Sequence, residues 1–542
     1  MKKILLITLA IVTACNAMAS DFSAVCSTGQ TLYYTITSTA NKTVAVVPQY
    51  PNPNFYDTFP TGVLTIPGNV IFNTINYNVT SIGGNAFYSC NKLIGSLTIP
   101  GSVTSIDSGA FSGCIELTAY IVDPGNKRYS SSEGIIYNLL KDTLVACPDG
   151  KTGSLIIPSS VTTIGNYAFS GCTGLTGNLT IPGSVVSIGN SAFSACTGFT
   201  GSLTIPGSVT SIGNSAFSDC TGFTGSLTLP NLITSIGDWA FYGCSGLNGS
   251  LLIPGSVISI GNSAFRFCTG FIGSLTIPNS VTSIGGGAFS GCSKLTTFIV
   301  EPGNNRYSSS NGIIYSLLQD TVVACPSSST GILTIPGSVT AIGSYAYSDC
   351  KGLSGSLIIP SSVKAIGDYA FMECSGLNGS LIIPASINYI GKFAFINCSG
   401  LTAIYAYANI PVNLDTDIFY TWVFEGIDKT NCTLYVPAGS KSSYQAADQW
   451  KDFLNIVELT TAVPGINYNN IKIYPNPVTA YFQIDGIVGT AMLMLSDLNG
   501  KVLLQKQIVN NEKIATNNFG SGSYIVKVVT SKGIVNTKLV KK

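Results

Sequence analysis

Apolar and polar residues alternate along this chain in short stretches that recur with a fixed period. In residues 201–220, GSLTIPGSVTSIGNSAFSDC, Leu203 and Ile205 alternate with Ser202 and Thr204. A period of two predicts a short strand whose Leu and Ile side chains face inward and whose Ser and Thr side chains face outward. We therefore predict a chain of short strands, each with one buried face.

The residues after each strand predict how the chain turns. Pro206 ends the strand because it has no N–H for another ladder hydrogen bond. Val209 and Ile212 supply a second inward edge, and Gly213 allows a tight corner. Residues 214–220 then predict a short helical turn that buries three side chains, those of Ala216, Phe217 and Cys220. Each unit therefore closes as a coil around an apolar interior.

Ile–Pro or Leu–Pro pairs mark the repeat along most of the chain. Most intervals between them are 24 residues, two are 58 and the first is 33. The prolines are Pro67, Pro100, Pro158, Pro182, Pro206, Pro230, Pro254, Pro278, Pro336, Pro360 and Pro384. A fixed period of this size predicts a solenoid, because one unit cannot bury its apolar face without stacking on its neighbours.

The full unit, L-x-I-P-x-S-V-x-x-I-G-x-x-A-F-x-x-C-x-x-L, resembles the leucine-rich repeats of the BspA-like family of bacterial surface proteins. The resemblance covers about residues 60 to 455, in about ten copies. It implies a mainly β solenoid, a right-handed leucine-rich-repeat array with short helical turns. Most units depart from the family by one extra residue, as in the spacing of Cys172, Leu175 and Leu179.

Two related stretches interrupt the period. CIELTAYIVDPGNKRYSSSEGIIYNLLKDTLVACP starts at Cys114, and CSKLTTFIVEPGNNRYSSSNGIIYSLLQDTVVACP starts at Cys292. Each predicts a strand, a Pro–Gly–Asn turn and a hairpin. We expect elongated repeats at about residues 115–153 and 293–331. Each is either an enlarged coil or a projecting contact surface, for which the candidate residues are Arg128, Tyr129, Arg306 and Tyr307.

Both ends of the array depart from the period and are interpreted as caps. Residues 20–60 contain strand-like sequence and predict an N-terminal β cap, followed by the solenoid at residues 61–402. Residues 403–459 predict a C-terminal cap. Its last segment places four apolar side chains on one helical face: Tyr444, Ala447, Trp450 and Phe453.

Residues 1–19 have the pattern of a secretory signal peptide. A lysine pair precedes an apolar run and a small-residue site, Ala17-x-Ala19, so cleavage is expected after Ala19. A competing interpretation is a lipoprotein box that ends at Cys15, which would carry the lipid. No later apolar run reaches the roughly 20 residues of a membrane-spanning helix, so no transmembrane segment is expected.

After a linker at residues 460–470 the period disappears. Residues 471–542 alternate apolar and polar residues between Asn–Gly and Lys–Gly turns, which predicts a small β-sandwich. Three segments resemble the C-terminal sorting domain of type IX secretion in the Bacteroidetes group: residues 473–477, 497–501 and 522–524. The resemblance implies that this tail engages the type IX secretion machinery, directs export across the outer membrane and is then removed. The alternative is an ordinary adhesive β domain.

The amino-acid composition argues against catalysis and against nucleic-acid binding. The 542 residues include no histidine, and only 9% are charged. The usual general base is therefore missing, no paired carboxylates recur at a fixed spacing, and we expect no catalytic site and no cofactor. The tail has nine lysines and three acidic residues, whereas the remainder is mildly acidic. Neither part has the dense basic patch that would indicate nucleic-acid binding.

Most of the sixteen cysteines occupy one position of the coil. They are Cys90, Cys114, Cys172, Cys196, Cys220, Cys244, Cys268, Cys292, Cys350, Cys374 and Cys398. This regularity predicts a ladder of buried thiols in place of a disulfide framework, because free Cys packs as a small apolar side chain. Zinc is not expected, since there is no CxxC pair and no histidine. Four others lie off the ladder and stay unassigned: Cys26, Cys147, Cys325 and Cys432.

The outward strand positions form rows of hydroxyl side chains that make a candidate interaction face. They are Ser96, Thr98, Thr180, Ser202, Thr204, Ser226, Thr228, Ser250, Ser274, Thr276 and Thr334. Such a face can hold an extended partner through many modest contacts. The family resemblance implies that the partners are host extracellular proteins, other bacterial surfaces or glycans. We therefore expect an exported protein, at the cell surface or extracellular, that binds one of these partners.

Two other functions use the same features. A structural, self-associating role in a surface layer needs the same fold and export route. An ice-binding face is disfavoured, because the hydroxyl rows are broken at Asn178 and Ile332.

Overall fold

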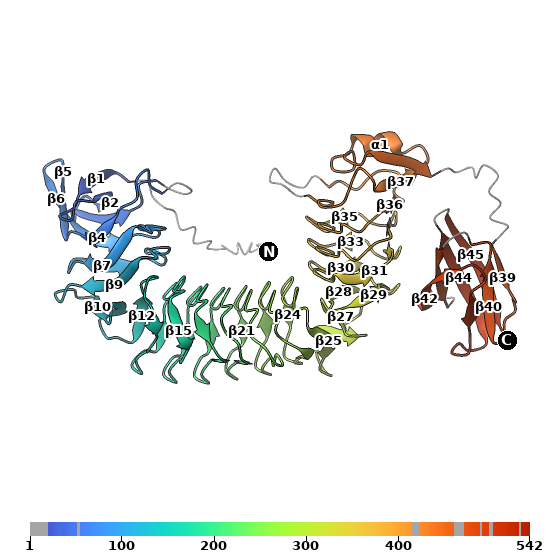
Figure 1. Ribbon diagram of the computed structural model, residues 1–542, viewed down its shortest axis with the longest axis horizontal. Coiled ribbons are helices and arrows are strands. Elements are labelled where there is room, and N and C mark those ends of the chain that lie inside the picture. Colours follow the sequence, from blue (N-terminus) through green and yellow to red (C-terminus); the bar gives the residue numbers. More distant parts are fainter. Residues whose placement is uncertain are drawn as a thin grey trace, which may run out of the picture. The chain divides into compact units, whose positions relative to one another are not determined.

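The computed structural model describes residues 20–50, 55–414, 422–459, 471–487, 490–497, 502–530 and 533–542 (Figure 1). The expected signal peptide, its cleavage site, Cys15 and the linker at residues 460–470 lie outside this range. The chain forms two compact units, Met1–Phe271 and Ile272–Lys542. Each unit is considered by itself below.

The first unit begins with a six-stranded sheet in the order β1-β2-β3-β6-β5, in which β8 pairs with β6. Its strands are β1 (Phe22–Val25), β2 (Thr31–Ser38), β3 (Thr43–Val47), β5 (Asn69–Phe72), β6 (Ile75–Ile82) and β8 (Ser105–Ile106). A second, three-stranded parallel sheet lies in the same region: β4 (Gly62–Thr65), β7 (Leu93–Ile99) and β9 (Leu117–Val122). The array therefore starts on a paired sheet, without a free strand edge at β3.

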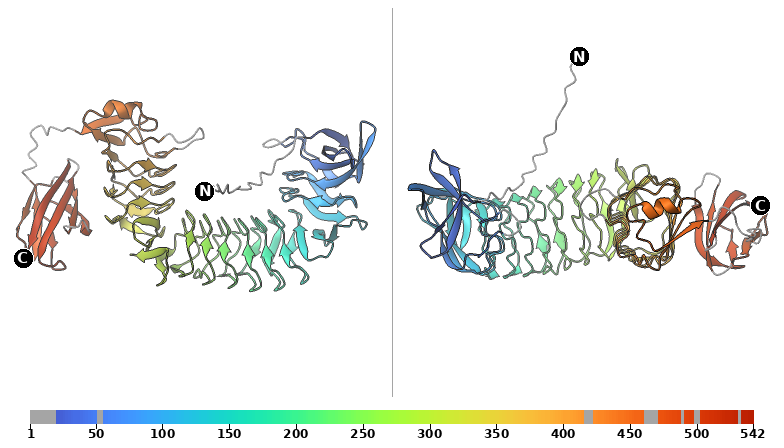
Figure 2. Two further views of the ribbon diagram at one scale, coloured as in Figure 1. Left: turned by 180° about the vertical axis from the view of Figure 1, so that it is seen from behind. Right: turned by 90° about the horizontal axis from the view of Figure 1, so that it is seen from above.

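The coils of the first unit stack through parallel strands. One ladder consists of β14 (Thr163–Ile164), β16 (Ser187–Ile188) and β19 (Ser211–Ile212), and each strand pairs with its counterpart in the next coil. The same position recurs in β21 (Ser235–Ile236) and β22 (Ser259–Ile260). The first elongated repeat adds β10 (Tyr129–Ser132), β11 (Ile135–Asn138) and β12 (Thr143–Ala146). Figure 2 shows these coils following one another along the unit.

The row that carries the predicted hydroxyl face is less regular. It contains β13 (Gly153–Ser154), β15 (Leu175–Asn178), β17 (Phe199–Thr200), β18 (Leu203–Thr204) and β20 (Leu227–Thr228). These strands form three-stranded and two-stranded pieces, and no single sheet runs through them. Each of these strands except β15 is two residues long, so neighbouring coils share few strand hydrogen bonds on this side.

The second unit repeats the plan. Its first strands are β23 (Gly273–Ile277), β24 (Ser283–Ile284) and β25 (Leu295–Val300). One ladder contains β26 (Tyr307–Ser310), β27 (Ile313–Ser316), β28 (Thr321–Ala324), β30 (Ala341–Ile342), β33 (Ala365–Ile366) and β35 (Tyr389–Ile390). The others are β29 (Thr330–Ile332), β31 (Gly352–Ser354), β32 (Leu357–Ile358), β34 (Ser380–Ile383), β36 (Ala403–Ala406), β37 (Thr433–Pro437) and β38 (Asn455–Leu459).

The tail, residues 471–542, folds into two antiparallel sheets around its own core, as the alternating pattern predicts. One sheet contains β39 (Lys472–Tyr474), β40 (Tyr481–Asp485) and β43 (Lys513–Ala515). The other contains β41 (Thr490–Ser496), β42 (Val502–Val509), β44 (Gly522–Thr530) and β45 (Gly533–Lys541). Of the three signature segments, residues 498–501 of the second lie outside the described range.

The interior of each coil is built by a stack of aromatic rings. In the first unit Phe169, Phe193, Phe217, Phe241 and Phe265 stack on one another with centroid separations of 4.9 to 5.5 Å and nearly parallel planes. All five are fully buried. The repeated Phe therefore contacts the same residue of the neighbouring coil, so that one ring–ring contact recurs at every step of the stack.

The predicted helical segments differ in the structure. Residues 214–219 form hydrogen-bonded turns and not helix, because Ser215 and Asp219 have φ of 54° and 58°, outside the helical region. Helix α1 (Lys441–Ala446) ends before Ala447, which is extended, so the expected helical face over residues 444–453 is wrong. The rings of Tyr444, Trp450 and Phe453 are nevertheless buried, since the turns after α1 fold back toward it.

Candidate functional site

The candidate hydroxyl residues lie on the outside of the coils. Nine of the eleven are exposed, and the other two, Ser96 and Thr98 in β7, are half-buried. We call the positions 154, 156, 178, 180, 202, 204, 226, 228, 250 and 252 the hydroxyl surface; its ends carry Ile156 and Leu252, which are 72% and 74% exposed. None of these positions holds a charged residue. The surface therefore offers hydroxyl and apolar groups and the amide of Asn178, without a charge pattern to steer a ligand.

The elongated repeats are held into the coil by one asparagine each. The buried Asn126 donates to the carbonyl oxygens of Pro100 (3.0 Å) and Val103 (2.9 Å) and accepts from the N–H groups of Arg128 and Tyr129. Asn304 makes the same four bonds in the second unit. The hairpin that follows is therefore anchored to the preceding coil.

The four candidate insert residues divide into two kinds. Tyr129 and Tyr307 are half-buried, and their hydroxyls accept hydrogen bonds from the N–H groups of Ile106 (3.1 Å) and Ile284 (2.9 Å). Arg128 and Arg306 are exposed. The tyrosines thus tie neighbouring coils together, and the arginines are the members of this set that face solvent.

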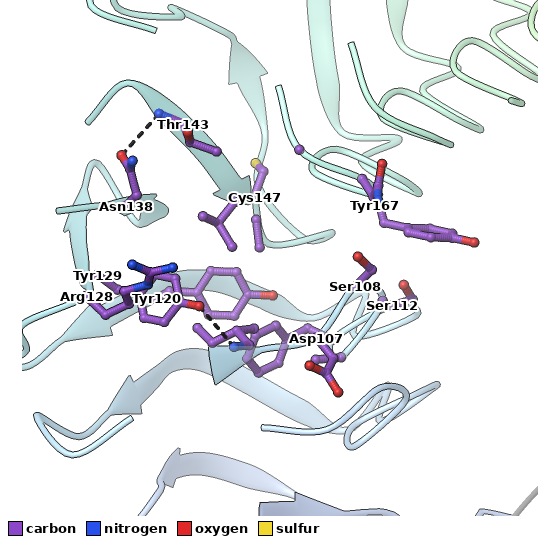
Figure 3. Close-up of a pocket in the computed structure, with 18 of the residues that line it drawn as sticks. Asp107, Ser108, Ser112, Tyr120, Arg128, Tyr129, Asn138, Thr143, Cys147 and Tyr167 are labelled. Carbon is purple, nitrogen blue, oxygen red and sulfur yellow. Dashed lines mark hydrogen bonds between the residues drawn. The ribbon is translucent and has the colours of Figure 1, made fainter. Parts of the chain in front are cut away.

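A cavity of about 550 Å³ lies beside the first elongated repeat, and we call it the repeat cavity. Its lining comes from three parts of the chain: the turn at residues 106–112, the elongated repeat from Tyr120 to Asp149, and residues 165–167. Arg128 and Tyr129 are among the lining residues, so the structure brings two of the predicted residues to a concave site. Figure 3 shows where Tyr120, Arg128, Tyr129 and Tyr167 lie among the residues that line this cavity.

Two buried polar groups of the repeat cavity were missed by the sequence analysis. Tyr120 is 1% exposed, and its hydroxyl has no hydrogen-bond partner among the described residues. Burial raises the pKa of Tyr120 well above its usual range, so the hydroxyl stays a neutral donor. Asp149 accepts a hydrogen bond of 2.7 Å from the N–H of Gly113. The second elongated repeat has Phe298 at the position of Tyr120 and Ser327 at the position of Asp149. An alignment of the two repeats would therefore have singled out these two residues.

Asp149 is expected to make the protein less stable as the pH rises. Burial raises its pKa to about 6, above the ordinary 3.8, so the folded state binds its proton more tightly than the unfolded state does. The stabilisation is complete below about pH 4 and is lost as the pH rises toward 6, with an upper limit of about 3 kcal/mol. Urea unfolding at pH 4.5 and 7 measures the effect.

The matched variant for this measurement is Asp149→Ser. In the second unit the equivalent Ser327 hydroxyl accepts from the N–H of Gly291 at 2.8 Å, so serine can replace the carboxylate at this contact. The variant should lose part of the pH dependence and the exposed Asp123→Asn variant should keep it. An identical pH profile for Asp149→Ser and the unmodified protein would contradict the assignment.

The cysteine ladder has a hydrogen-bonding role as well as a packing role. Successive thiols donate to the carbonyl oxygen of the Phe in the preceding coil, at 3.0 Å for Cys196 to Phe169, 2.9 Å for Cys220 to Phe193 and 2.9 Å for Cys244 to Phe217. Each of the fifteen cysteines in the described range is buried and unbridged. At the two places where an elongated repeat precedes the ladder, the thiol donates to a proline carbonyl oxygen instead, at 3.6 Å for Cys172 to Pro148 and 3.5 Å for Cys350 to Pro326.

The native ladder is expected to resist alkylation. Burial raises the pKa of Cys220 and of Cys398 to about 12, and only the thiolate reacts with iodoacetamide. At pH 8 the folded protein should therefore incorporate almost no label on ladder cysteines, and protein unfolded in guanidinium should label fully. Mass spectrometry of both samples makes the comparison; rapid labelling of ladder cysteines in the folded protein would show that the coils open.

Two kinds of feature are absent from the described part of the chain. No helix there has the length and hydrophobicity needed to cross a membrane. No group of three or more Cys, Asp or Glu side chains in the described range is placed to hold a metal ion.

Comparison with known families gives two matches. The BspA type leucine-rich repeat region matches residues 68–133, 149–248, 223–324 and 323–431. The secretion system C-terminal sorting domain matches residues 472–542. No curated protein matches the chain.

Several solved structures are similar to the chain. A leucine-rich cell surface protein from Faecalibacterium prausnitzii is 23% identical, with 82% of this chain and 96% of that chain covered and a TM-score of 0.37. A leucine-rich-repeat protein from Bacteroides ovatus is 25% identical, with 74% and 98% covered and a TM-score of 0.31. The pneumococcal vaccine antigen PcpA is 15% identical, with 82% and 100% covered and a TM-score of 0.32.

Proposed function

Because the chain belongs to the BspA type leucine-rich-repeat family and ends in a type IX sorting domain, we propose that it is an exported adhesion protein. Its partners are host extracellular proteins, other bacterial surfaces or glycans, and it performs no catalysis. The sorting domain indicates a location at the cell surface or outside the cell. The observation that carries the proposal is the hydroxyl surface, which is exposed, repeated and without charge.

The chemistry of this surface favours binding over a passive role. Thr180, Thr204 and Thr228 present a methyl group and a hydroxyl at a spacing of one coil, so an extended partner can make the same contact several times. Exposed Ile156 and Leu252 continue the row with apolar area, of the kind that is enriched where proteins meet. Contacts of this type depend little on salt.

Each elongated repeat adds an exposed apolar tip. Leu140 and Leu318 follow strands β11 and β27 and are 78% and 80% exposed. Leu139 and Leu317 beside them are also exposed. A repeated pair of exposed leucines is uncommon on a surface that contacts only water, and it supports a partner that touches the hairpins.

The test is binding of the full-length mature protein to matrix proteins, plasma proteins, mucin and glycans at two salt concentrations. We expect saturable binding to one class, little changed by salt. The variant Thr204→Asp/Thr228→Asp places two charges on the hydroxyl surface and should weaken that binding about tenfold or more. The control is Thr221→Asp, which adds a charge at an exposed position outside that surface.

The competing function is a self-associating component of a surface layer. Binding to none of these partners, together with concentration-dependent self-association in analytical ultracentrifugation, would replace adhesion by that function. Equal binding by the double variant and the unmodified protein would remove the hydroxyl surface from the proposal.

A further inference from the structure

The first elongated repeat has a cysteine where a regular coil has the ring of the aromatic stack. In the regular coil that follows, the N–H of Phe169 donates to the carbonyl oxygen of Ala192 at 2.7 Å. The N–H of Cys147 makes the same hydrogen bond with Ala168, also at 2.7 Å. Cys147 therefore holds the Phe position of its own coil, with a buried thiol in place of a ring.

The second elongated repeat is built in the same way. The N–H of Cys325 donates to the carbonyl oxygen of Ala346 at 2.7 Å. In the next coil the N–H of Tyr347 donates to Ala370 at 2.8 Å, so this tyrosine holds the Phe position there. Both cysteines thus occupy one place in the two copies. A ring–ring contact between neighbouring coils is lost at each of them, because the stack needs a ring in every coil.

Two thiols converge on one carbonyl oxygen in the first elongated repeat. The Sγ atom of Cys147 lies 3.7 Å from the carbonyl oxygen of Pro148, and the Sγ atom of Cys172 lies 3.6 Å from the same oxygen. In a regular coil the ladder thiol donates to the oxygen of a Phe, as Cys220 does to Phe193 at 2.9 Å. The two sulfur atoms of the elongated repeat are therefore neighbours, no further apart than the sum of their distances to the shared oxygen.

The second elongated repeat has an equivalent pair. The Sγ atoms of Cys325 and Cys350 lie 3.8 and 3.5 Å from the carbonyl oxygen of Pro326. The neighbouring Cys147 thiol is the main cause that raises the pKa of Cys172, ahead of burial, and the Cys325 thiol has the same effect on the pKa of Cys350. In each pair, one thiol is thus close enough to affect the proton of the other.

These pairs differ in geometry from successive cysteines of the ladder. Cys196 and Cys220 hold one position in consecutive coils, so their Cα–Cβ bonds run in parallel and neither thiol is aimed at the other. Cys147 and Cys172 hold two different positions, and their thiols point at a common atom. A disulfide needs sulfur atoms about 2.05 Å apart on side chains that approach each other. Rotation of two converging side chains supplies that approach.

Formation of such a bond needs an oxidant. The sorting domain indicates export, and disulfides form and persist outside the cytoplasm. One thiolate of the pair attacks the disulfide of the oxidant and releases one thiol from it; the second thiolate then attacks the mixed disulfide and releases the other. Two protons and two electrons leave the pair, and the oxidant, a protein disulfide of the periplasm or glutathione disulfide, becomes two thiols. Because Cys172 and Cys350 have no exposed surface, the exchange belongs to folding, before the coils close.

We propose that Cys147 with Cys172, and Cys325 with Cys350, form two disulfide bonds in the exported protein, and that each bond fastens an elongated repeat to the next coil where the aromatic stack is interrupted. The structure describes the thiol form of both pairs. The other cysteines of the ladder stay free. The hydroxyl surface has no part in this inference, which therefore does not depend on adhesion.

Mapping the cysteines of the exported protein tests the proposal. The protein is collected from a bacterium with this secretion system, unfolded in guanidinium with N-ethylmaleimide and without reductant, digested and analysed by mass spectrometry. We expect two pairs of linked peptides, and label on the other eleven of the fifteen cysteines. Protein that is reduced before unfolding should carry label on all fifteen, so full labelling of the unfolded ladder applies to the reduced protein.

Thermal unfolding with and without reductant gives a second measurement. Reduction of the unmodified protein should lower Tm by about 5 °C, because each bond restricts the unfolded chain. In the double variant Cys147→Ser/Cys325→Ser, whose hydroxyls can donate to the same proline oxygens, reduction should leave Tm unchanged. The matched control Cys196→Ser/Cys374→Ser removes two ladder thiols outside the pairs and should keep the response. Each variant is compared with itself, so a general loss of stability does not affect the result.

Three results would overturn the proposal. They are label on all fifteen cysteines without reduction, linkage of successive ladder cysteines such as Cys196 and Cys220 in place of the two pairs, or an equal response to reduction in Cys147→Ser/Cys325→Ser and the unmodified protein. If a variant does not fold, the peptide map of the unmodified protein still decides.

Discussion

Deleting residues 471–542 is expected to stop the protein at the inner side of the outer membrane. These residues match the sorting domain almost from end to end and fold around their own core, so they are the part that the type IX machinery engages. In a bacterium with this secretion system, the shortened protein should disappear from the cell surface and the medium and accumulate in the periplasm. Fractionation followed by immunoblotting measures the distribution.

The control for export is a deletion within the array. Removing residues 201–224 takes out one complete coil, and the strands of neighbouring coils, such as β16 and β19, already pair at the spacing of one coil. This protein should still be exported. If the protein that lacks residues 471–542 still reaches the medium in normal amounts, the tail is an ordinary domain of the mature protein.

Replacing Phe217 by alanine is expected to destabilise the array by about 3–5 kcal/mol. The ring is fully buried between Phe193 at 5.2 Å and Phe241 at 5.5 Å, with planes within 6° of parallel. Alanine would leave a cavity that the neighbouring coils cannot fill, because their backbones are linked by hydrogen bonds such as that from the N–H of Phe217 to the oxygen of Ala240. Urea unfolding followed by circular dichroism gives the change in stability.

The matched control is Trp239→Ser. Trp239 is 47% exposed and has φ of 53°, and serine occupies the same position in the coils before and after, with φ of 54° at Ser215 and 52° at Ser263. This variant should change stability by about 0.5 kcal/mol or less. A loss of less than about 1 kcal/mol in Phe217→Ala would mean that the aromatic stack does not hold neighbouring coils together.

The sequence predicted the fold well where one residue type has one role in every coil. Leu203, Ile205, Phe217 and Cys220 are all buried as predicted, because each packs beside its counterpart in the next coil and the period alone places it. The prediction of helix failed at residues 214–220 and after Ala446. The backbone conformation of short segments that contain residues with positive φ is set by the surrounding contacts and not by the hydrophobic period.

The candidate site was predicted in part. Exposure of the hydroxyl residues follows from strand alternation, so most of them lie where the pattern put them. The insert residues were predicted as contact residues from their motif. In the structure Asn126 and Tyr129 of this motif form hydrogen bonds with the preceding coil, so the motif stabilises the fold. Tyr120 and Asp149 were overlooked because nothing in their local sequence distinguishes a buried polar residue from an exposed one.

By itself the sequence determined the repeat, the identity of the interior residues and the sorting domain at residues 472–542. These follow from periodicity and from motifs, which are local properties of the chain. Only the tertiary structure decided that the thiols donate to the carbonyl groups of the preceding coil, that Asp149 is buried against Gly113, and that a cavity lies beside the first elongated repeat. Each of these depends on distances between neighbouring coils, and such distances are set by how the coils pack and not by the local sequence.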